Sequence, residues 1–109
     1  EYDIDYIKQT DGIPYCKECG GIIRPAITFY GEFLDKETFK QARLDTKNAD
    51  LLIVLGTSLV VYPASEIVSH FRGKNLVIIN KKRTKFNLQA NLVIQEDFAK
   101  VFNALLKEL

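Results

Sequence analysis

The sequence contains no Met and no Trp, a single His and only two Cys. Two cysteines are too few for a disulfide framework, so we expect a reducing compartment, the cytoplasm. The longest uninterrupted apolar run, Leu51 to Leu55, is far too short to span a bilayer, so we expect no membrane partner. The first residues show neither a basic start nor an apolar segment, so no signal peptide is expected. Without Met, the chain is interpreted as a fragment or a processed product.

The chain also has almost no excess of charge. It carries 15 basic and 14 acidic residues, a net charge of +1, and this balance argues against a nucleic-acid partner. A content of 47% hydrophobic and 27% charged residues is typical of globular proteins. At 109 residues the chain is one domain's worth of polypeptide with a modest core.

Two apolar runs predict strands that are buried on both faces. The first, Leu51 to Leu55, ends at Gly56, and the second, Leu76 to Ile79, ends at Asn80. A helix is expected between them, from about Pro63 to Phe71, because Pro suits the first turn of a helix. A strand, a helix and a second strand in this order predict a parallel pair joined by a right-handed crossover.

Further elements extend this α/β pattern. A third short strand is expected at 92–94, and a surface helix at about 35–46. The last helix has one apolar stripe with helical spacing, formed by Phe98, Val101, Phe102, Leu105, Leu106 and Leu109. The alternation predicts a parallel sheet with helices on both faces.

The cysteines form the motif Cys16-Lys17-Glu18-Cys19-Gly20-Gly21. A two-residue spacer lets both thiolates bind one metal ion, and the glycines let backbone amides turn toward the sulfurs. A zinc knuckle is favoured over a redox pair or incidental thiols. Structural zinc takes four ligands, and His70, within a helical pattern, is interpreted as a surface or helix-end residue. The remaining ligands are therefore expected before residue 1, or from a second chain.

Three other segments could contact a ligand. Gly56-Thr57-Ser58 follows a buried strand, where open α/β sheets bind ligands, although it also suits a plain turn. Asn80 ends the next strand and could meet a ribose or simply terminate the strand. The aromatic residues of Phe29-Tyr30-Gly31-Glu32 could line a peptide groove or anchor a turn. The basic cluster 81–83 is interpreted as a solvated loop.

Taken in order, these motifs resemble those of sirtuins, most strongly the bacterial and archaeal members, over essentially the whole chain. The segments that carry the resemblance are Cys16-x-x-Cys19-Gly20-Gly21, Ile23-Arg24-Pro25, Phe29-Tyr30-Gly31-Glu32, Asp50 to Leu59, Val60-Val61-Tyr62-Pro63-Ala64 and Val77-Ile78-Ile79-Asn80. The resemblance implies the C-terminal half of a Rossmann-like NAD-binding domain at 28–109. It also implies part of a small zinc-binding module at 1–27, with Cys16 and Cys19 as the second half of a four-Cys zinc site.

The resemblance also implies residue roles. The expected NAD-contacting residues are Gly56, Thr57, Ser58, Asn80, Lys81, Asp97 and Phe98. An acyl-lysine peptide is expected to lie between two segments, contacting Thr28, Tyr30, Gly31, Glu32, Val60, Val61 and Tyr62. Tyr30 replaces the family's usual Phe, and Thr28 stands where Val is common.

The activity that the resemblance implies is NAD-dependent removal of acyl groups from lysine, with structural zinc. No catalytic residue is expected in this chain, because the catalytic histidine, the glycine-rich NAD loop and the first cysteine pair belong to the family's N-terminal half. That half is an expected partner, and the chain alone is expected to be inert. Two alternatives stay open: a non-catalytic zinc-ribbon module and a degenerate NAD-binding scaffold.

Overall fold

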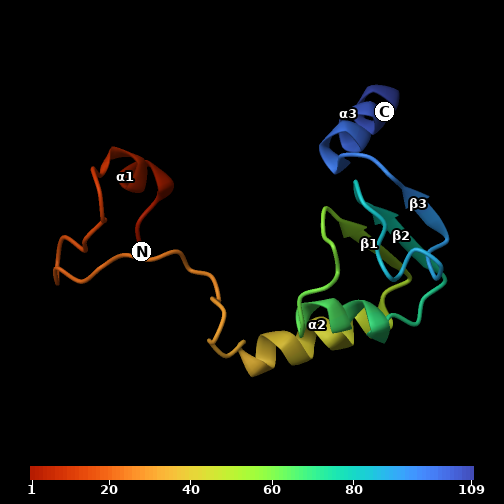
Figure 1. Cartoon of the computed structure of the whole chain (residues 1–109), viewed down its shortest axis with the longest axis horizontal. Coiled ribbons are helices and arrows are strands. Elements are labelled where there is room, and N and C mark those ends of the chain that lie inside the picture. Colours follow the sequence, from red (N-terminus) through yellow and green to blue (C-terminus); the bar gives the residue numbers. More distant parts are fainter. The chain divides into compact units, whose positions relative to one another are not determined.

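The computed structural model describes all 109 residues, and they form two compact regions (Figure 1). The N-terminal region is Glu1–Leu34 and the C-terminal region is Asp35–Leu109, whereas the sequence motifs place a boundary after residue 27. No helix in either region combines the length and the apolar character that a membrane span requires.

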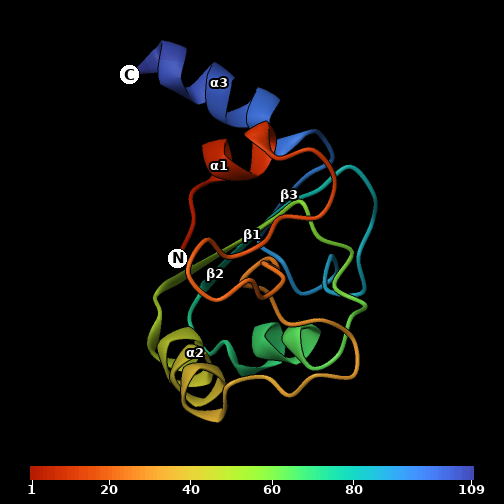
Figure 2. The same cartoon turned by 90° about the vertical axis from the view of Figure 1, so that its left-hand side faces the viewer.

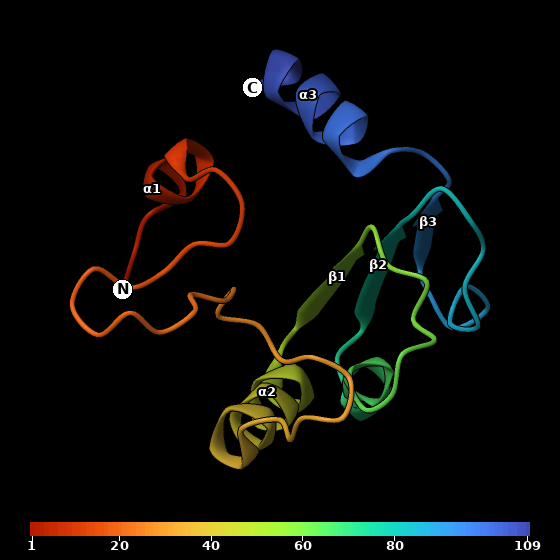
Figure 3. The same cartoon turned by 60° about the vertical axis from the view of Figure 1, so that its left-hand side comes forward.

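The C-terminal region is built on a parallel sheet of three strands in the order β1-β2-β3. The strands are β1 (Leu51–Leu55), β2 (Asn75–Ile79) and β3 (Leu92–Ile94). In the register, Leu51 lies opposite Asn75, and Val77 opposite Leu92. The predicted strands and their parallel pairing are confirmed, and Figure 3 shows them side by side.

Two α-helices of this region begin directly after an aspartate. The carboxylate of Asp35 accepts from the Thr38 amide at 2.7 Å and starts α2 (Lys36–Asn48). In the same way Asp97 accepts from the Ala99 amide at 2.9 Å and starts α3 (Phe98–Glu108). Such N-caps satisfy amides that have no partner within the helix. Both predicted helices are confirmed, and they lie at opposite ends of the strands (Figures 1 and 3).

The segment between β1 and β2 differs in helix type from the prediction. It forms a 3₁₀ helix, η1 (Ala64–His70), with Pro63 as its N-cap residue. The Glu66 amide donates to the Pro63 carbonyl, and the Phe71 amide to the Val68 carbonyl, over three residues. Short connectors often take this tighter winding. Helix η1 packs beside α2, as Figure 2 shows.

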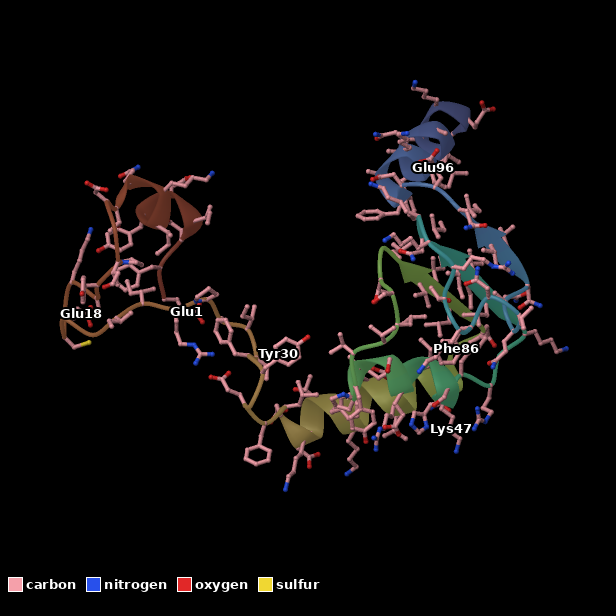
Figure 4. All side chains as sticks on the ribbon, in the orientation of Figure 1. Glu1, Glu18, Tyr30, Lys47, Phe86 and Glu96 are labelled. Carbon is pink, nitrogen blue, oxygen red and sulfur yellow. The ribbon has the colours of Figure 1, made fainter.

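The core of the C-terminal region centres on β2. Ile78 is fully buried, and Phe86 (labelled in Figure 4) closes the same cluster. The buried members of the cluster are Val54, Leu59, Val68, Leu76, Ile78 and Phe86. Because both edges of β2 are paired, it is the strand that this chain buries most completely.

The prediction that β1 is buried on both faces is wrong for this chain. Leu52 packs against the core and Val54 is part of it, but Leu51, Ile53 and Leu55 are exposed, Ile53 by 44%. Alternate residues of a strand point to opposite faces, so these three side chains form one uncovered apolar face. The sheet order also leaves the outer edge of β1 without a strand neighbour.

The N-terminal region contains a helix that the sequence patterns did not predict. Helix α1 (Ile4–Gln9) begins after Asp3, whose carboxylate accepts from the Tyr6 amide at 2.8 Å. It has only six residues and buries none of them, so it lacks the apolar periodicity that reveals longer helices. No residue of Glu1–Leu34 is fully buried, so polar contacts rather than an apolar core define this region.

Candidate functional site

A small cavity lies where two strands end and the last helix begins. It has a volume of about 190 Å³ and collects five of the seven residues predicted to contact NAD. Its lining residues are Gly56, Asn80, Lys81, Glu96, Asp97 and Phe98. Figure 4 labels Glu96 at the base of α3. Carboxyl ends of parallel strands are the usual place for ligands in open α/β sheets.

Gly56 keeps the end of β1 close to α3. Its amide donates to the Ile79 carbonyl at 3.0 Å, which continues the pairing of β1 with β2 for one residue. Its φ of +57° lies in the left-handed region, which a glycine adopts without strain. A Cβ atom here would lie 3.0 Å from the ring of Phe98, so a larger residue would crowd the cavity wall.

One wall of the cavity is an ion pair. The Lys81 ammonium lies 2.8 Å from the Asp97 carboxylate, which also caps α3. The hydrogen bond between these two groups raises the pKa of Lys81 and lowers the pKa of Asp97. Both groups are therefore charged at neutral pH. The pair fixes the loop after β2 to the start of α3.

Glu96 lines the cavity but was not predicted as a site residue. Its carboxylate accepts from the Asp97 amide at 2.7 Å, and this bond lowers the pKa of Glu96, with Lys100 adding to the effect. In the sequence, the feature that could have indicated a role for Glu96 in the site is its position directly before Asp97 and α3. It adds a second negative charge beside Asp97.

Thr57 and Ser58 do not line this cavity. The hydroxyl of Thr57 accepts from the Leu59 amide at 3.2 Å and stabilises the turn in which Leu59 has a positive φ of 54°. Ser58, in the same turn, is exposed. Thr57 thus has the turn-stabilising role that the sequence left open for this motif.

The Asn80 side chain is oriented by its own loop. Its amide nitrogen donates to the Lys82 carbonyl at 2.7 Å, and its backbone amide donates to the Ile94 carbonyl at 3.1 Å. The second bond ties the end of β2 to β3. The cavity therefore combines an oriented amide, two carboxylates, an ammonium group and an aromatic ring. Such a set can bind a small polar ligand that has hydroxyl groups and a flat ring.

The residues predicted to contact a peptide fall in both regions. Thr28, Tyr30, Gly31 and Glu32 lie in the N-terminal region, and Val60, Val61 and Tyr62 in the C-terminal region. Tyr30 is 91% exposed and projects from its loop, as Figure 4 shows. Tyr62 is 75% exposed. Exposed aromatic and branched apolar side chains of this kind are available for contact with a partner.

Glu32 is engaged within its own loop. Its two carboxylate oxygens accept from the Arg24 guanidinium at 2.5 and 2.9 Å, a two-point ion pair. The same carboxylate accepts from the Phe29 amide at 3.0 Å. The bond from Arg24, followed by the bond from Phe29, lowers the pKa of Glu32 to about 2. The sequence motifs include Arg24 but predict no role for it.

The two cysteines lie on one tight turn of the N-terminal region. The Cys16 amide donates to the Gly21 carbonyl at 2.7 Å, and the Gly20 amide donates back to the Cys16 carbonyl at 2.9 Å. Gly20 has a φ of +71°, which lets the chain reverse here. Both thiols are free, and Tyr2 donates its hydroxyl to the Cys16 sulfur at 3.2 Å.

These contacts favour the thiolate form of Cys16. The hydrogen bond from Tyr2, with backbone bonds from Cys19 and Glu18, lowers the pKa of Cys16 to about 6. A thiolate is the form that binds metal. No group of three or more His, Cys, Asp or Glu side chains in the chain is placed to hold a metal ion. The turn offers two thiols, half the number of ligands that a structural zinc site takes.

The single histidine takes no part in either site. His70 ends η1, and its Nε2 lies 3.3 Å from the Glu66 carboxylate, which also accepts from Arg43. The sequence interpretation of His70 as a helix-end residue is confirmed.

Comparison with known proteins decides the family. The model of the Sir2 family matches residues 2–63, more than half of the chain. The chain belongs to the Sir2 family. The resemblance to sirtuins drawn from the motifs is thereby confirmed, and the Sir2 model spans the cysteine turn, the Arg24–Glu32 loop and β1.

Relatives of this Sir2 chain include bacterial proteins named NAD-dependent protein deacetylase. That of Staphylococcus aureus (strain Mu50) is 48% identical over 104 residues, covering 95% of this chain and 42% of the relative. That of Fusobacterium nucleatum is 48% identical over 92 residues, covering 84% of this chain and 36% of the relative. This Sir2 chain thus spans less than half the length of these relatives.

Solved Sir2 structures share the fold of the chain. A complex of Sir2 with a p53 peptide and NAD⁺ gives a TM-score of 0.74 at 36% identity, covering 96% of this chain and 44% of that one. Sir2Tm bound to a propionylated peptide gives the same TM-score and identity. The α/β fold with a parallel sheet is therefore that of Sir2 proteins.

Proposed function

We propose that this chain is the C-terminal part of an NAD-dependent protein-lysine deacylase, which releases nicotinamide and O-acyl-ADP-ribose. The observation that carries the proposal is the cavity at the ends of β1 and β2, in a chain of the Sir2 family. A related structure holds both NAD⁺ and a p53 peptide, which supports these two substrate classes. The zinc-ribbon alternative is not favoured, because relatives over 95% of the chain are named deacetylases.

In this proposal the cavity holds part of NAD, which supplies the acyl-accepting sugar when bound. Asn80 presents its side chain toward ribose hydroxyls from an orientation fixed by the Lys82 carbonyl. Phe98 offers a ring face, and the Lys81–Asp97 pair keeps the loop and α3 together around the ligand. Ser58, exposed beside Thr57, remains a proposed NAD contact from the rim.

The peptide is proposed to bind along the exposed segments at Thr28–Glu32 and Val60–Tyr62. Peptides that bind as an added strand gain main-chain hydrogen bonds from such extended segments. The relatives' structures with acetylated and propionylated peptides support an acyl-lysine partner. No residue in this chain is proposed to act as the catalytic base.

The rest of the sheet and of the zinc site is proposed to come from the N-terminal half of the same protein. The open edge of β1 and its exposed apolar face are a surface on which further strands and helices can pack. Cys16 and Cys19 are proposed to share a structural zinc ion with two cysteines of that half. A cytoplasmic location belongs to the same proposal and agrees with two free thiols.

The test is nicotinamide release from NAD and an acetylated peptide by the full-length protein that contains this chain. We expect turnover by the full-length protein and none by the 109-residue chain alone. Asn80→Ala should raise the KM for NAD about tenfold, the loss of one good hydrogen bond to a ligand. Asn103→Ala, an exposed asparagine on α3, is the matched control and should leave KM unchanged. Turnover by the chain alone, or equal effects of both substitutions, would contradict the proposal.

A further inference from the structure

The segment from Arg24 to Glu32 is closed by polar contacts among its own residues. Arg24 pairs with both oxygens of Glu32, and one of its nitrogens also donates to the Ile27 carbonyl at 2.9 Å. Its guanidinium lies 4.7 Å above the ring of Phe29. Glu32 makes two hydrogen bonds with Phe29. Its carboxylate accepts from the Phe29 amide, and its backbone amide donates to the Phe29 carbonyl at 3.1 Å.

We propose that Arg24 and Glu32 form a clasp that presets the loop between them for an acyl-lysine peptide, and that Glu32 acts through this loop rather than by touching the substrate. The clasp is the Arg24–Glu32 ion pair together with its bonds to Ile27 and Phe29. This inference rests on the proposed function for its substrate, and it changes the role expected for Glu32.

The hydrogen bonds of Glu32 leave little capacity for a substrate. A carboxylate has about four acceptor positions, and the clasp uses three of them. Arg24 is occupied in a similar way by Glu32, Ile27 and the Phe29 ring. Both charges therefore face each other and the loop backbone, and the loop presents Tyr30 outward instead.

The loop belongs to no helix or strand and has no buried core beneath it. No residue of Glu1–Leu34 is fully buried, and residues 24–32 contain no helix or strand. Gly31 has a φ of +87°, so the chain turns sharply just before Glu32. Without the clasp, the loop would sample many conformations, and a peptide would bind only after ordering it.

The clasp is partly exposed, which makes it a positioning device rather than a source of overall stability. The side chains of Arg24 and Glu32 are 53% and 40% exposed. Exposed ion pairs contribute little to the free energy of unfolding. Removing the clasp should therefore leave the fold intact and change only how the loop is held.

A double-mutant cycle separates positioning from direct contact. In the full-length protein, we would measure the affinity for a labelled acetyl-lysine peptide, together with kcat and the KM for NAD. Arg24→Gln and Glu32→Gln should each weaken peptide affinity about tenfold, with the KM for NAD unchanged. The double variant should be no weaker than either single variant, because each one alone opens the clasp. Arg24→Lys should give an intermediate affinity, since an ammonium group cannot pair with both oxygens in the same plane.

Glu37→Gln is the matched control. Glu37 forms an exposed pair with Lys40 at 3.8 Å on α2, so its loss removes a comparable charge without touching the loop. Peptide affinity should not change. If Glu32→Gln weakens affinity and Arg24→Gln does not, or if their effects add, Glu32 touches the substrate and the proposal is overturned.

A second measurement needs no activity and follows one backbone amide of the full-length protein. The Phe29 amide donates to Glu32, so its hydrogen exchange should be several-fold faster in Arg24→Gln than in the unaltered protein. Equal exchange rates of the Phe29 amide in the variant and in the unaltered protein would overturn the proposal. A full-length protein that binds the peptide in a clasp-dependent way but releases no nicotinamide would contradict the proposed deacylase function alone.

Discussion

The two regions of this chain are stabilised in different ways. The C-terminal region packs β1, β2, η1 and neighbouring loops around Ile78 and has an apolar core. The N-terminal region has no fully buried residue and depends on local polar contacts such as the Asp3 cap and the Tyr2–Cys16 bond, while the Arg24–Glu32 pair holds one loop. A region without a core depends on the identity of single side chains, whereas a packed region depends mainly on volume.

The largest expected difference between the two regions comes from truncating an isoleucine to alanine in each of them. Ile78→Ala should lower the free energy of unfolding of the C-terminal region by about 2–5 kcal/mol, because it empties a fully buried site. Ile22→Ala, at a side chain that is 66% exposed, should change stability by no more than about 0.5 kcal/mol. Urea unfolding followed by the amide resonances of each region measures both. Equal losses would mean that Ile22 belongs to a core after all.

A glycine substitution should give the next largest effect. At Gly73 an added Cβ would lie 2.4 Å from the Ala49 carbonyl and 2.6 Å from the Phe71 ring, so Gly73→Ala should cost about 1–3 kcal/mol. At Gly21 in the N-terminal region the added atom would meet only the Cys19 sulfur at 3.5 Å, an ordinary contact. Gly21→Ala should therefore be tolerated. Thermal unfolding of the two variants is the measurement, and a stable Gly73→Ala variant would show that β2 and the end of α2 can separate.

The smallest expected effect is local and tests the polar contacts of the N-terminal region. Tyr2→Phe removes the largest contribution to the lowered pKa of Cys16, so this pKa should rise from about 6 toward 9. Less thiolate is then present at pH 7: the ionised fraction of Cys16 falls from about nine-tenths at a pKa near 6 to about one-tenth at a pKa near 8, so metal-free Cys16 should be alkylated several-fold more slowly. Above pH 9 the rates should converge. Mass spectrometry of the Cys16 peptide follows the reaction.

Tyr6→Phe is the control for this experiment. The Tyr6 hydroxyl donates to the Tyr15 carbonyl at 2.9 Å and makes no bond to the sulfur. Its removal should leave the alkylation rate of Cys16 unchanged at pH 7. A slower rate in both variants would point to a general loosening of the turn instead.

Much of the C-terminal region could be predicted because its signals are local. The apolar runs of β1 and β2 and the stripe on α3 are periodic, and each lies within a few residues of a stop signal such as Gly56. The burial of β1 was overestimated, because an apolar run does not show which chain segment will cover it. Helix α1 was missed because its six residues bury no side chain and so show no apolar stripe.

The site was only partly predictable for a related reason. Gly56, Asn80 and Asp97 follow strands or open a helix, so their gathering at one end of the sheet follows from topology. The Arg24–Glu32 pair joins residues eight apart in an irregular loop. No periodicity links such positions, and the left-handed turn at Gly31, directly before Glu32, has no pattern that marks its partner.

The open edge of β1 also bears on how the chain behaves in solution. Strand β1 has five consecutive apolar residues with no charge and no proline, and the backbone groups along its outer edge are not paired with another strand. Exposed edges of this kind recruit further strands. The isolated polypeptide should therefore be prone to cross-β aggregation as its concentration rises. A lysine introduced at the exposed position of Ile53 would act as a gatekeeper against it.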